Sequence, residues 1–402
     1  MTVFLARQPI LDANLNVFGY ELFYRSGFTN HYTGVNADEA STEVIVDTFQ
    51  NLGLSSLTDG KPAFINFSTA LLQREIATLF PAENLVIEIL ETVVADENTV
   101  QNCRRLKEAG YKLALDDFAF QENLMPLLDL ADIIKIDLQA VEGNALVKFI
   151  QPLKDKRYTL LAEKVETWDQ FRLTRDIGFR LFQGYFFSRP EIVTAKKLDP
   201  LQISCLRLIS KVNEPEFDFD ELAEIISRDV SLSYSLIRLV NSAAFAKRET
   251  ITSIKHALVY LGEREIRKWV SLVALRRISV TKPGIAVVTS MVRARFIELL
   301  AARTKWRPYQ GMLFLAGLFS LLDVLLQKPM PDILEEIAAP APMQELLIYG
   351  TGPFQDLWEV VLAYEKGRWR GIEDQAAALA LAPRVLTEAY LEAVQWSAAS
   401  AA

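Results

Sequence analysis

The chain has 402 residues, half of them hydrophobic, and a formal net charge of −8, all of which lies in residues 1–200. This length supports two hydrophobic cores, and the absence of a basic stripe argues against nucleic-acid binding. Two separated cysteines, no signal peptide and no apolar run of roughly 18 residues argue against a disulfide framework, secretion and a membrane span, so we expect a cytoplasmic protein.

Residues 1–195 alternate short apolar runs of strand composition with helical stretches. The first two runs, ARQPILD and VFGYELFYR, are joined by a tight turn, so the first strands depart from strict βα order. The alternation predicts parallel strands with helical crossovers and favours an α/β TIM-like barrel over a doubly wound sheet. Helices are predicted near 38–51, 69–79, 97–109, 121–130, 141–154 and 167–177.

Near residue 190 the pattern changes, because strand signals nearly vanish and apolar residues recur at helical spacing. Seven prolines between 283 and 353 punctuate the later helices. The sequence therefore predicts a barrel domain over residues 1–195 and an all-α domain over residues 196–402.

Most of the strand-like runs in the first domain end in polar residues. In a βα barrel the carboxyl ends of the strands open on one face, so these side chains are expected to converge into one acidic pocket. Carboxylate and amide oxygens favour Mg²⁺ or Mn²⁺, and two such ions suit hydrolysis of a phosphodiester. The residues are Asn66, Glu88, Glu91, Asp116, Asp117, Lys135, Asp137, Glu163, Glu166 and Gln183.

Each of these signals also has an ordinary structural interpretation. The pair Asp116–Asp117 is common in exposed turns, and Glu88 and Glu91 fit a solvated acidic turn. Lys135 fits an edge strand that faces solvent. Covalent chemistry is not indicated, because the chain has no GxSxG motif and neither cysteine lies near a histidine.

The segments ARQPI, GYELFYR, FINFS, EILET, LALDDF, IIKID, AEKVE and FQGYFFSRP resemble those of the EAL domain, a bacterial phosphodiesterase that linearises cyclic di-GMP. The segment from SLSYSLIRLVNS to HALVYLG, with GLFSLLDVLL and AYEKGRW, resembles the HDOD domain. Together they resemble the EAL–HDOD signalling proteins over nearly the whole chain.

The EAL resemblance assigns roles to residues of this sequence. It implies that a pair of Mg²⁺ or Mn²⁺ ions is held by Glu21, Asn66, Glu88, Asp116, Asp117 and Glu163. It also implies that Lys135 and Gln183 position the attacking water, with Lys135 a candidate proton acceptor. Glu91 would anchor the loop after Asp117, and Gln8 and Arg25 would contact the dinucleotide.

Three departures from the family pattern lie between these side chains. The signature reads Glu21-Leu22-Phe23, and the loop after Asp117, Ala119 to Asn123, lacks the usual glycines and hydroxyls. Lys164 replaces a glycine, which restricts the backbone if positive φ is needed there.

These observations support two hypotheses. The first is a metal-dependent phosphodiesterase that hydrolyses cyclic di-GMP to pGpG and carries a non-catalytic HDOD module. The second is a cyclic di-GMP receptor, or a protein-interaction scaffold, with a weak or inactive EAL domain. His256 is the sole histidine of the second half, so that half is expected to bind an unidentified protein partner rather than catalyse. A homodimer and an unrelated barrel enzyme stay open.

Overall fold

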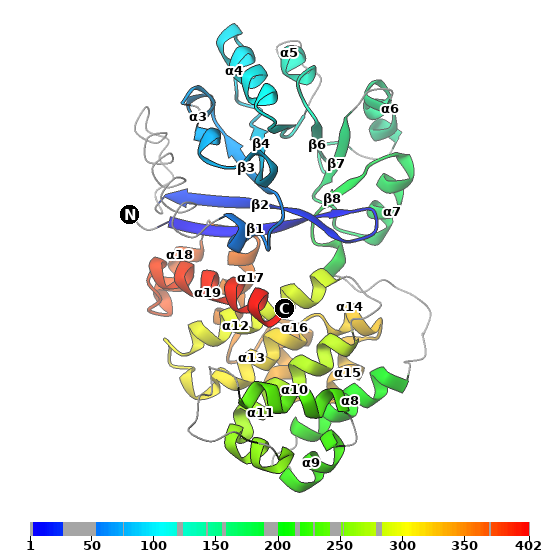
Figure 1. Ribbon diagram of the computed structural model, residues 1–402, viewed down its shortest axis with the longest axis vertical. Coiled ribbons are helices and arrows are strands. Elements are labelled where there is room, and N and C mark those ends of the chain that lie inside the picture. The colour runs from blue at the N-terminus through cyan, green and yellow to red at the C-terminus, as the bar shows by residue number, and fades with distance from the viewer. Residues whose placement is uncertain are drawn as a thin grey trace. The chain divides into compact units, whose positions relative to one another are not determined.

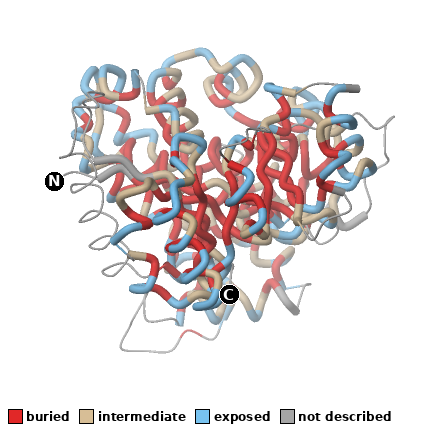
Figure 2. The backbone as a smooth tube through the Cα atoms, turned by 90° about the horizontal axis from the view of Figure 1, so that it is seen from above, coloured by how far each residue is buried: buried red, intermediate tan, exposed pale blue. Residues whose placement is uncertain are grey.

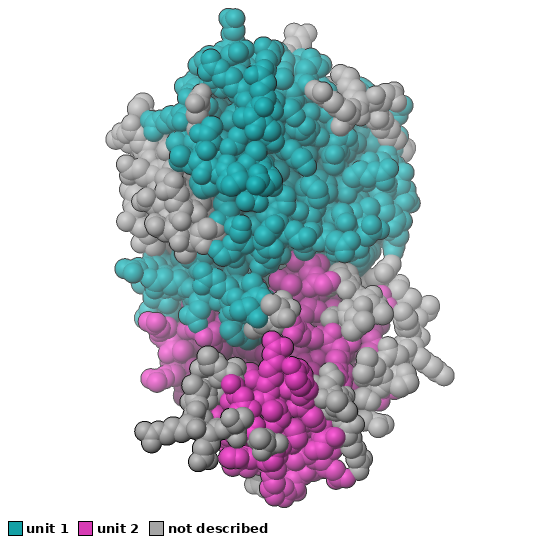
Figure 3. All heavy atoms as spheres, in the orientation of Figure 1, with its two compact units in different colours: residues 1–189, 359–402 teal, residues 190–358 magenta. Residues whose placement is uncertain are grey.

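The computed structural model describes residues 3–26, 54–74, 76–118, 124–141, 144–154, 158–188, 200–213, 218–227, 230–241, 251, 253–278, 284–369 and 371–401. By their internal contacts, the residues form two compact units (Figure 3). The barrel unit comprises residues 1–189 and 359–402, and the helical unit comprises residues 190–358.

Eight strands close into a barrel in chain order (Figure 1). Strand β1 pairs antiparallel with β2 and β8, and all other neighbouring strands are parallel. The predicted fold class, a TIM-like barrel with an irregular first strand pair followed by a helical region, is confirmed. The strands are β1 (Val3–Asp12), β2 (Val17–Ser26), β3 (Ala63–Phe67), β4 (Leu85–Ile89), β5 (Lys112–Leu115), β6 (Ile133–Asp137), β7 (Thr159–Glu163) and β8 (Leu181–Gln183).

The turn between β1 and β2 is set by Asp12. Its Oδ1 accepts hydrogen bonds from the backbone N–H groups of Asn14 and Asn16, at 2.8 and 2.9 Å. Leu15 completes the turn with φ of 65°. This local side-chain bonding reverses the chain within a few residues and gives the antiparallel first pair.

Helical segments connect most of the parallel strands. The helix predicted near 38–51 lies outside the described residues, and the other predicted stretches contain helix. Helix α7 begins with a capping box between Thr167 and Gln170 and ends at Gly178, whose φ of 119° suits glycine. The segments are α2 (Leu54–Leu57), α3 (Thr69–Gln73), η1 (Ile76–Leu79), η2 (Ala82–Asn84), α4 (Glu97–Glu108), α5 (Met125–Leu128), α6 (Asn144–Lys154), α7 (Trp168–Ile177) and η4 (Phe186–Ser188).

A layer of buried side chains fills the barrel interior, with one contributed by each strand except β2. Figure 2 colours buried residues red, and the barrel strands are largely buried. The interior is therefore a packed core rather than a channel. The layer consists of Ile10, Phe64, Val86, Ala114, Ile133, Leu161 and Leu181.

The helical unit is built around its own hydrophobic core, which includes Leu236, Ile266 and Val270. Helices α12 and α13 cross closely at Gly317, where a Cβ would lie 2.6 Å from the Cα of Ala294. The helices are α8 (Pro200–Asn213), α9 (Phe219–Ser227), α10 (Val230–Val240), α11 (Ile254–Ile278), α12 (Gly284–Ala301), η6 (Arg307–Tyr309), α13 (Gln310–Phe319), α14 (Leu322–Leu326), α15 (Met330–Glu336) and α16 (Ala341–Tyr349).

One stretch of the helical unit, Arg307–Leu326, is long and apolar enough to cross a membrane, with a mean hydropathy of 1.7. The expectation that no apolar run has this length is therefore wrong. However, 67% of the stretch is buried inside the protein. A buried core helix passes the same test of length and composition, so the stretch is weak evidence for a span.

The C-terminal segment packs against the barrel. The division between the units falls within α17 (Gln355–Glu365), and α18 (Ile372–Ala378) and α19 (Pro383–Ala401) follow it in the barrel unit. Helix α19 lies against β1 (Figure 1). This grouping differs from the expected ranges 1–195 and 196–402, because contacts between segments distant in sequence place residues 359–402 with the barrel.

Two tyrosines attach this C-terminal segment to β1. The buried hydroxyl of Tyr364 donates to the backbone carbonyl of Leu5 at 3.1 Å, and the Tyr390 hydroxyl accepts from the backbone N–H of Arg7 at 3.5 Å. Arg7 also lies over the ring of Tyr20 on β2. The strands that carry Gln8 and Glu21 are therefore supported by residues from the end of the chain.

Candidate active site at the ends of the barrel strands

The candidate site forms one layer beyond the hydrophobic layer of the barrel. Residues two apart on a strand point to the same face. On five of the parallel strands that contribute a buried residue to the hydrophobic layer, the residue two positions later is therefore also directed into the barrel. On β2 the residue two positions after Gly19 is placed in the same way. The residues in this second layer include Glu21, Asn66, Glu88, Lys135, Glu163 and Gln183.

Four of these side chains, those of Glu21, Asn66, Glu163 and Gln183, border a cavity of about 240 Å³. Both Asp116 and Asp117 line it, although neighbours on a strand point to opposite faces. The backbone of Asp117 explains this, because its φ of 42° breaks the strand geometry immediately after β5. The lining residues are Gln8, Glu21, Phe23, Asn66, Asp116, Asp117, Glu163, Lys164 and Gln183.

Lys135 lies at the centre of a buried acidic cluster. Its ammonium nitrogen, Nζ, is 2.7 Å from both Glu88 Oε1 and Asp116 Oδ1, 3.0 Å from Glu163 Oε1 and 3.4 Å from Glu21 Oε2. Four carboxylates therefore surround one ammonium group, which leaves an excess of three negative charges when all are ionised. Lys135 is fully buried within the barrel and does not face solvent.

Burial and mutual repulsion perturb the protonation of this cluster. Burial raises the pKa of Glu88 well above its usual value, and the nearby Glu21 charge adds to the increase against the opposing effect of Lys135. Burial likewise raises the pKa of Glu163 to about 8, although Lys135 opposes it. Burial lowers the pKa of Lys135, but the four carboxylates outweigh it and raise that pKa well above normal. In this arrangement the Lys135 ammonium donates hydrogen bonds to the surrounding carboxylates.

Gln183 connects the two first strands to the site. Its Nε2 donates to Glu21 Oε2 at 2.6 Å and to Gln8 Oε1 at 3.1 Å. Among the described residues nothing donates to its Oε1. The amide thus fixes the Glu21 carboxylate and leaves an acceptor oxygen directed into a polar site.

For two predicted site residues, Glu91 and Arg25, the described part of the chain shows no contact with the site that matches the predicted role. Glu91 is exposed in the turn after β4. Burial is the main cause that raises the pKa of Asp117, and the charges of Asp116, Asp137 and, least of these, Glu91 add to it. The loop that it was predicted to anchor, Ala119 to Asn123, lies outside the described residues. Arg25 pairs with Phe4 through the β1–β2 ladder, and its side chain is not among those described.

The lysine that replaces glycine at position 164 adopts a left-handed backbone, with φ of 52°. Such a conformation is unfavourable for a residue with a Cβ. The Lys164 ammonium lies 2.5 Å from Asp137 Oδ2, and this hydrogen bond is the main reason that its pKa is raised. Asp137, which was predicted as a polar strand end but given no individual role, follows Lys135 by two positions and pairs with Glu163 across β6 and β7.

The donor atoms of the site suit a hard divalent cation. They are carboxylate and amide oxygens, and Glu88 Oε2, which is fully buried, accepts no hydrogen bond from the described residues. Nevertheless, the described residues contain no group of three His, Cys, Asp or Glu side chains arranged to hold a metal ion. The carboxylates are gathered around Lys135 instead. The chemistry of the donor set therefore fits a metal, whereas their present arrangement is an ion-pair network.

Two family models match the chain. The model of the EAL domain matches residues 37–190, and the model of the HDOD domain matches residues 198–348. The EAL match begins after β2, so Gln8, Glu21 and Arg25 precede it.

Two curated proteins are similar over almost their full lengths. Cyclic di-GMP phosphodiesterase CdgJ from Vibrio cholerae is 34% identical over 399 residues, which cover 98% of this chain and 92% of that protein. The uncharacterised protein YuxH from Bacillus subtilis is 33% identical, with 98% of each chain covered. Among solved structures, a manganese and cyclic di-GMP complex of Klebsiella pneumoniae BlrP1 is 24% identical with a TM-score of 0.40, covering 47% of this chain and 56% of that chain.

Proposed function

The chain belongs to the family in which an EAL domain is followed by an HDOD domain, and we propose that it is a metal-dependent phosphodiesterase that hydrolyses cyclic di-GMP to pGpG. The observation that carries this proposal is the convergence of Glu21, Glu88, Asp116 and Glu163 at one end of a closed barrel. The similarity to CdgJ over nearly the whole chain supports the same substrate.

The metal ligands that we propose come from β2, β3, β4, β7 and the end of β5. Bound Mg²⁺ or Mn²⁺ ions would lower the pKa of water and offset negative charge at the phosphate. They would also compensate the excess negative charge of the cluster, which Lys135 alone does not. The proposed ligands are Glu21, Asn66, Glu88, Asp116, Asp117 and Glu163.

The remaining polar residues would position the reactants. A water oxygen bonds to phosphorus and the bond from phosphorus to the 3′ oxygen breaks, since the product pGpG retains a 5′ phosphate. Lys135 and Gln183 would orient this water, because both donate hydrogen bonds into the carboxylate cluster. Gln8 and Arg25 would contact the dinucleotide from β1 and β2.

The test is product formation by the purified full-length chain with Mg²⁺ or Mn²⁺, followed by chromatography of pGpG. Glu21→Ala and Asp116→Asn should each abolish turnover. Glu108→Ala, which removes an exposed carboxylate on α4, should leave it unchanged. Absence of pGpG at high enzyme concentration with either metal would overturn the proposal.

The gathering of the carboxylates around Lys135 favours a second candidate, a receptor. A site without an open group of metal ligands could bind the dinucleotide and not cleave it. Calorimetric titration with cyclic di-GMP separates the possibilities. Binding without turnover supports a receptor, and the absence of binding supports a scaffold.

We also propose that the HDOD region is a non-catalytic module that contacts an unidentified protein in the cytoplasm. His256 supports this, because its side chain is exposed on α11 and is the sole histidine after residue 31. One imidazole cannot form the metal site of a phosphohydrolase. Homodimerisation of the chain is part of the same proposal and is tested by its mass in solution.

A further inference from the structure

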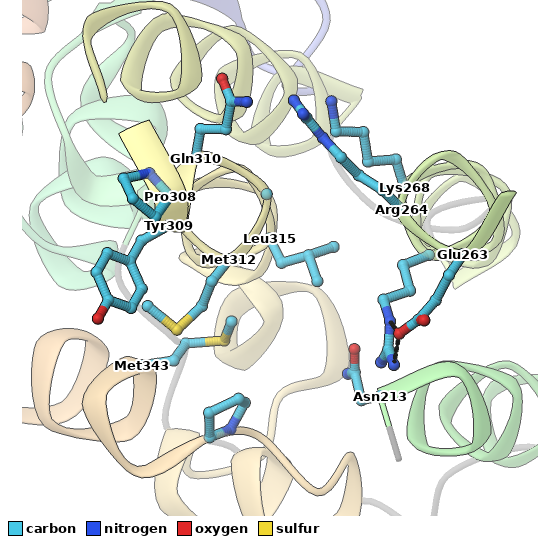
Figure 4. A pocket seen from close by; sticks show the side chains of 13 residues that line it. Asn213, Glu263, Arg264, Lys268, Pro308, Tyr309, Gln310, Met312, Leu315 and Met343 are labelled. Atoms are coloured by element: carbon cyan, nitrogen blue, oxygen red, sulfur yellow. Dashed lines mark hydrogen bonds and ion pairs between the residues drawn. The ribbon is translucent and has the colours of Figure 1, made fainter. Parts of the chain in front are cut away.

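The helical unit contains a cavity of about 450 Å³ that no part of the proposed function uses. Its volume lies within the range of small-molecule sites, roughly 300 to 1,000 Å³. The lining residues come from the end of α8, the middle of α11, and the segment from η6 through α16 (Figure 4). They are Asn213, Glu263, Arg264, Arg267, Lys268, Pro308, Tyr309, Gln310, Gly311, Met312, Leu315, Pro340 and Met343.

One wall of the cavity is cationic. Arg264 and Lys268 lie one turn apart on α11 and extend toward the same region, beside Gln310 (Figure 4). Their side-chain nitrogens both reach Glu298 Oε1, with Arg264 NH2 at 3.2 Å. With its amide oxygen turned toward Arg264, Gln310 accepts a hydrogen bond from NH1 at 2.7 Å.

The charges behind this wall are not balanced. Glu298 is buried, and Arg295 NH1 lies 2.8 Å from its Oε2, so three cations share this carboxylate. Glu265 is more distant, at 3.8 Å from Lys268 and 3.9 Å from Arg264, so these three cations face two carboxylates. Burial raises the pKa of Glu298, but Lys268 and Arg295 outweigh it and keep that pKa below normal. An excess of positive charge therefore lies at the cavity wall.

The remaining cation of the wall is compensated within the unit. Arg267 NH2 lies 2.5 Å from Glu263 Oε1, and its NH1 donates to the backbone carbonyl of Val212. Arg264 and Lys268 are therefore the cations of the wall that share Glu298, and the more distant Glu265, with each other. The side chain of Arg264 is 51% exposed, so an incoming anion can reach it.

The opposite wall is apolar. Met312, Leu315 and Met343 direct their side chains into the cavity, and Tyr309 lies at its side (Figure 4). Methionine side chains are flexible and polarizable, so they adapt to the flat face of a ring. A cavity with one cationic and one apolar wall matches a ligand with an anionic group at one end and an apolar body at the other.

We propose that this cavity binds a small phosphorylated molecule with an aromatic body, of the size of a nucleoside monophosphate. The phosphate lies between Arg264 and Lys268, because guanidinium and ammonium groups form strong charge-assisted hydrogen bonds with phosphate oxygens. The base lies on Met312 and Met343, with the amide of Asn213 at the cavity edge.

The experiment is calorimetric titration of the full-length chain with three probes, GMP, guanosine and inorganic phosphate. GMP should bind, and guanosine and phosphate should each bind at least about tenfold more weakly, because each lacks one part of the recognised molecule. Arg264→Gln and Lys268→Met should each weaken GMP binding by about tenfold to a hundredfold. Lys255→Met, which removes an exposed lysine of the same helix, should leave it unchanged.

Thermal unfolding of each variant verifies that the helical unit is folded. Absence of GMP binding, or GMP binding that persists unchanged in Arg264→Gln and Lys268→Met, would overturn the proposal. The second result would show that GMP binds at another site of the chain. Binding of GMP does not depend on phosphodiesterase activity, so the two proposals can fail independently.

Discussion

The two units bury charge in opposite ways. In the barrel, four carboxylates surround one ammonium group, that of Lys135. In the helical unit, three cations surround one carboxylate, that of Glu298. The first cluster has an excess of negative charge and is expected to attract cations. The second has an excess of positive charge and is expected to attract an anion.

The two clusters also differ in how readily the sequence pattern of strands and helices predicts them. Parallel strands bring their ends together, so acids at successive strand ends are recognisable as a group. Arg264 and Lys268 are four residues apart on a helix, and Arg295 and Glu298 are three apart on another. Such spacing is typical of solvated helix faces, and nothing in it indicates that the two pairs meet.

The largest effect is expected from Lys135→Met, which removes the single cation of the barrel cluster. Carboxylates left buried without a partner cost about 3–5 kcal/mol, so the free energy of unfolding at pH 7 should fall by that amount. Denaturant titration of the metal-free protein measures it. Lys107→Met is the control, because its partner Asp132 is partly exposed and the loss should stay below about 1 kcal/mol.

Added Mn²⁺ extends this prediction. If the carboxylates bind the ion, saturating Mn²⁺ should stabilise the unmodified chain by about 2.7 kcal/mol at one hundred times the dissociation constant, and a chelator should reverse the effect. Glu88→Gln should reduce the stabilisation. Equal stabilisation of the unmodified chain and this variant would show that the ion binds elsewhere.

Asp323 is a buried acid of the helical unit that, unlike Glu298, is not surrounded by several cations among the described residues. Burial raises its pKa to about 6, and the hydrogen bond from the backbone of Val324 opposes this only in part. The folded state therefore holds a proton that the unfolded state releases near pH 4. Stability should decrease as pH rises from about 4 through about 6, by at most about 3 kcal/mol from this group.

Asp323→Asn tests that assignment. The substitution keeps an oxygen that can accept from the N–H of Val324 and removes the titration. Its stability relative to the unmodified chain should increase with pH across the same window, as measured by denaturant titration at pH 4, 6 and 8. A difference that does not change with pH would show that Asp323 does not contribute.

The attachment of residues 359–402 to the barrel should be measurable as a smaller effect. Tyr364→Phe removes the buried hydroxyl that donates to the Leu5 carbonyl, and should reduce stability by about 1–2 kcal/mol. Tyr349→Phe is the control, because Tyr349 is 73% exposed. Equal losses in the two variants would contradict the assignment of the C-terminal segment to the barrel unit.

The smallest effect is expected at the position where lysine replaces glycine. Lys164→Gly should stabilise the barrel by about 0.5–1 kcal/mol, because it relieves a left-handed backbone and loses only a half-exposed ion pair. Lys164→Ala keeps the strain and loses the ion pair, so it should give no gain. Thermal unfolding of the three proteins makes the comparison.

Much of the barrel could be predicted before the structure was available. The turn around Asp12, the alternation of strands and helices, and the family resemblance are local or pattern-based signals, and the structure or the comparisons bear them out. The roles of the individual site residues stay predictions. Arg25 and the loop from Ala119 to Asn123 were chosen by resemblance, and the described residues do not define their contacts. Glu91 was chosen from its place after a strand, and the structure leaves it exposed.

The sequence by itself determined the order of elements, the acidic strand ends and the family, because period-two and helical patterns depend only on neighbouring residues. Only the tertiary structure decided which charged groups lie close together. It placed Lys135 among four carboxylates, joined Tyr364 to β1 across 359 positions, and opened a cationic cavity beside Glu298. These contacts join distant segments, and the energy of a buried charge depends on all the groups around it rather than on its neighbours in the chain.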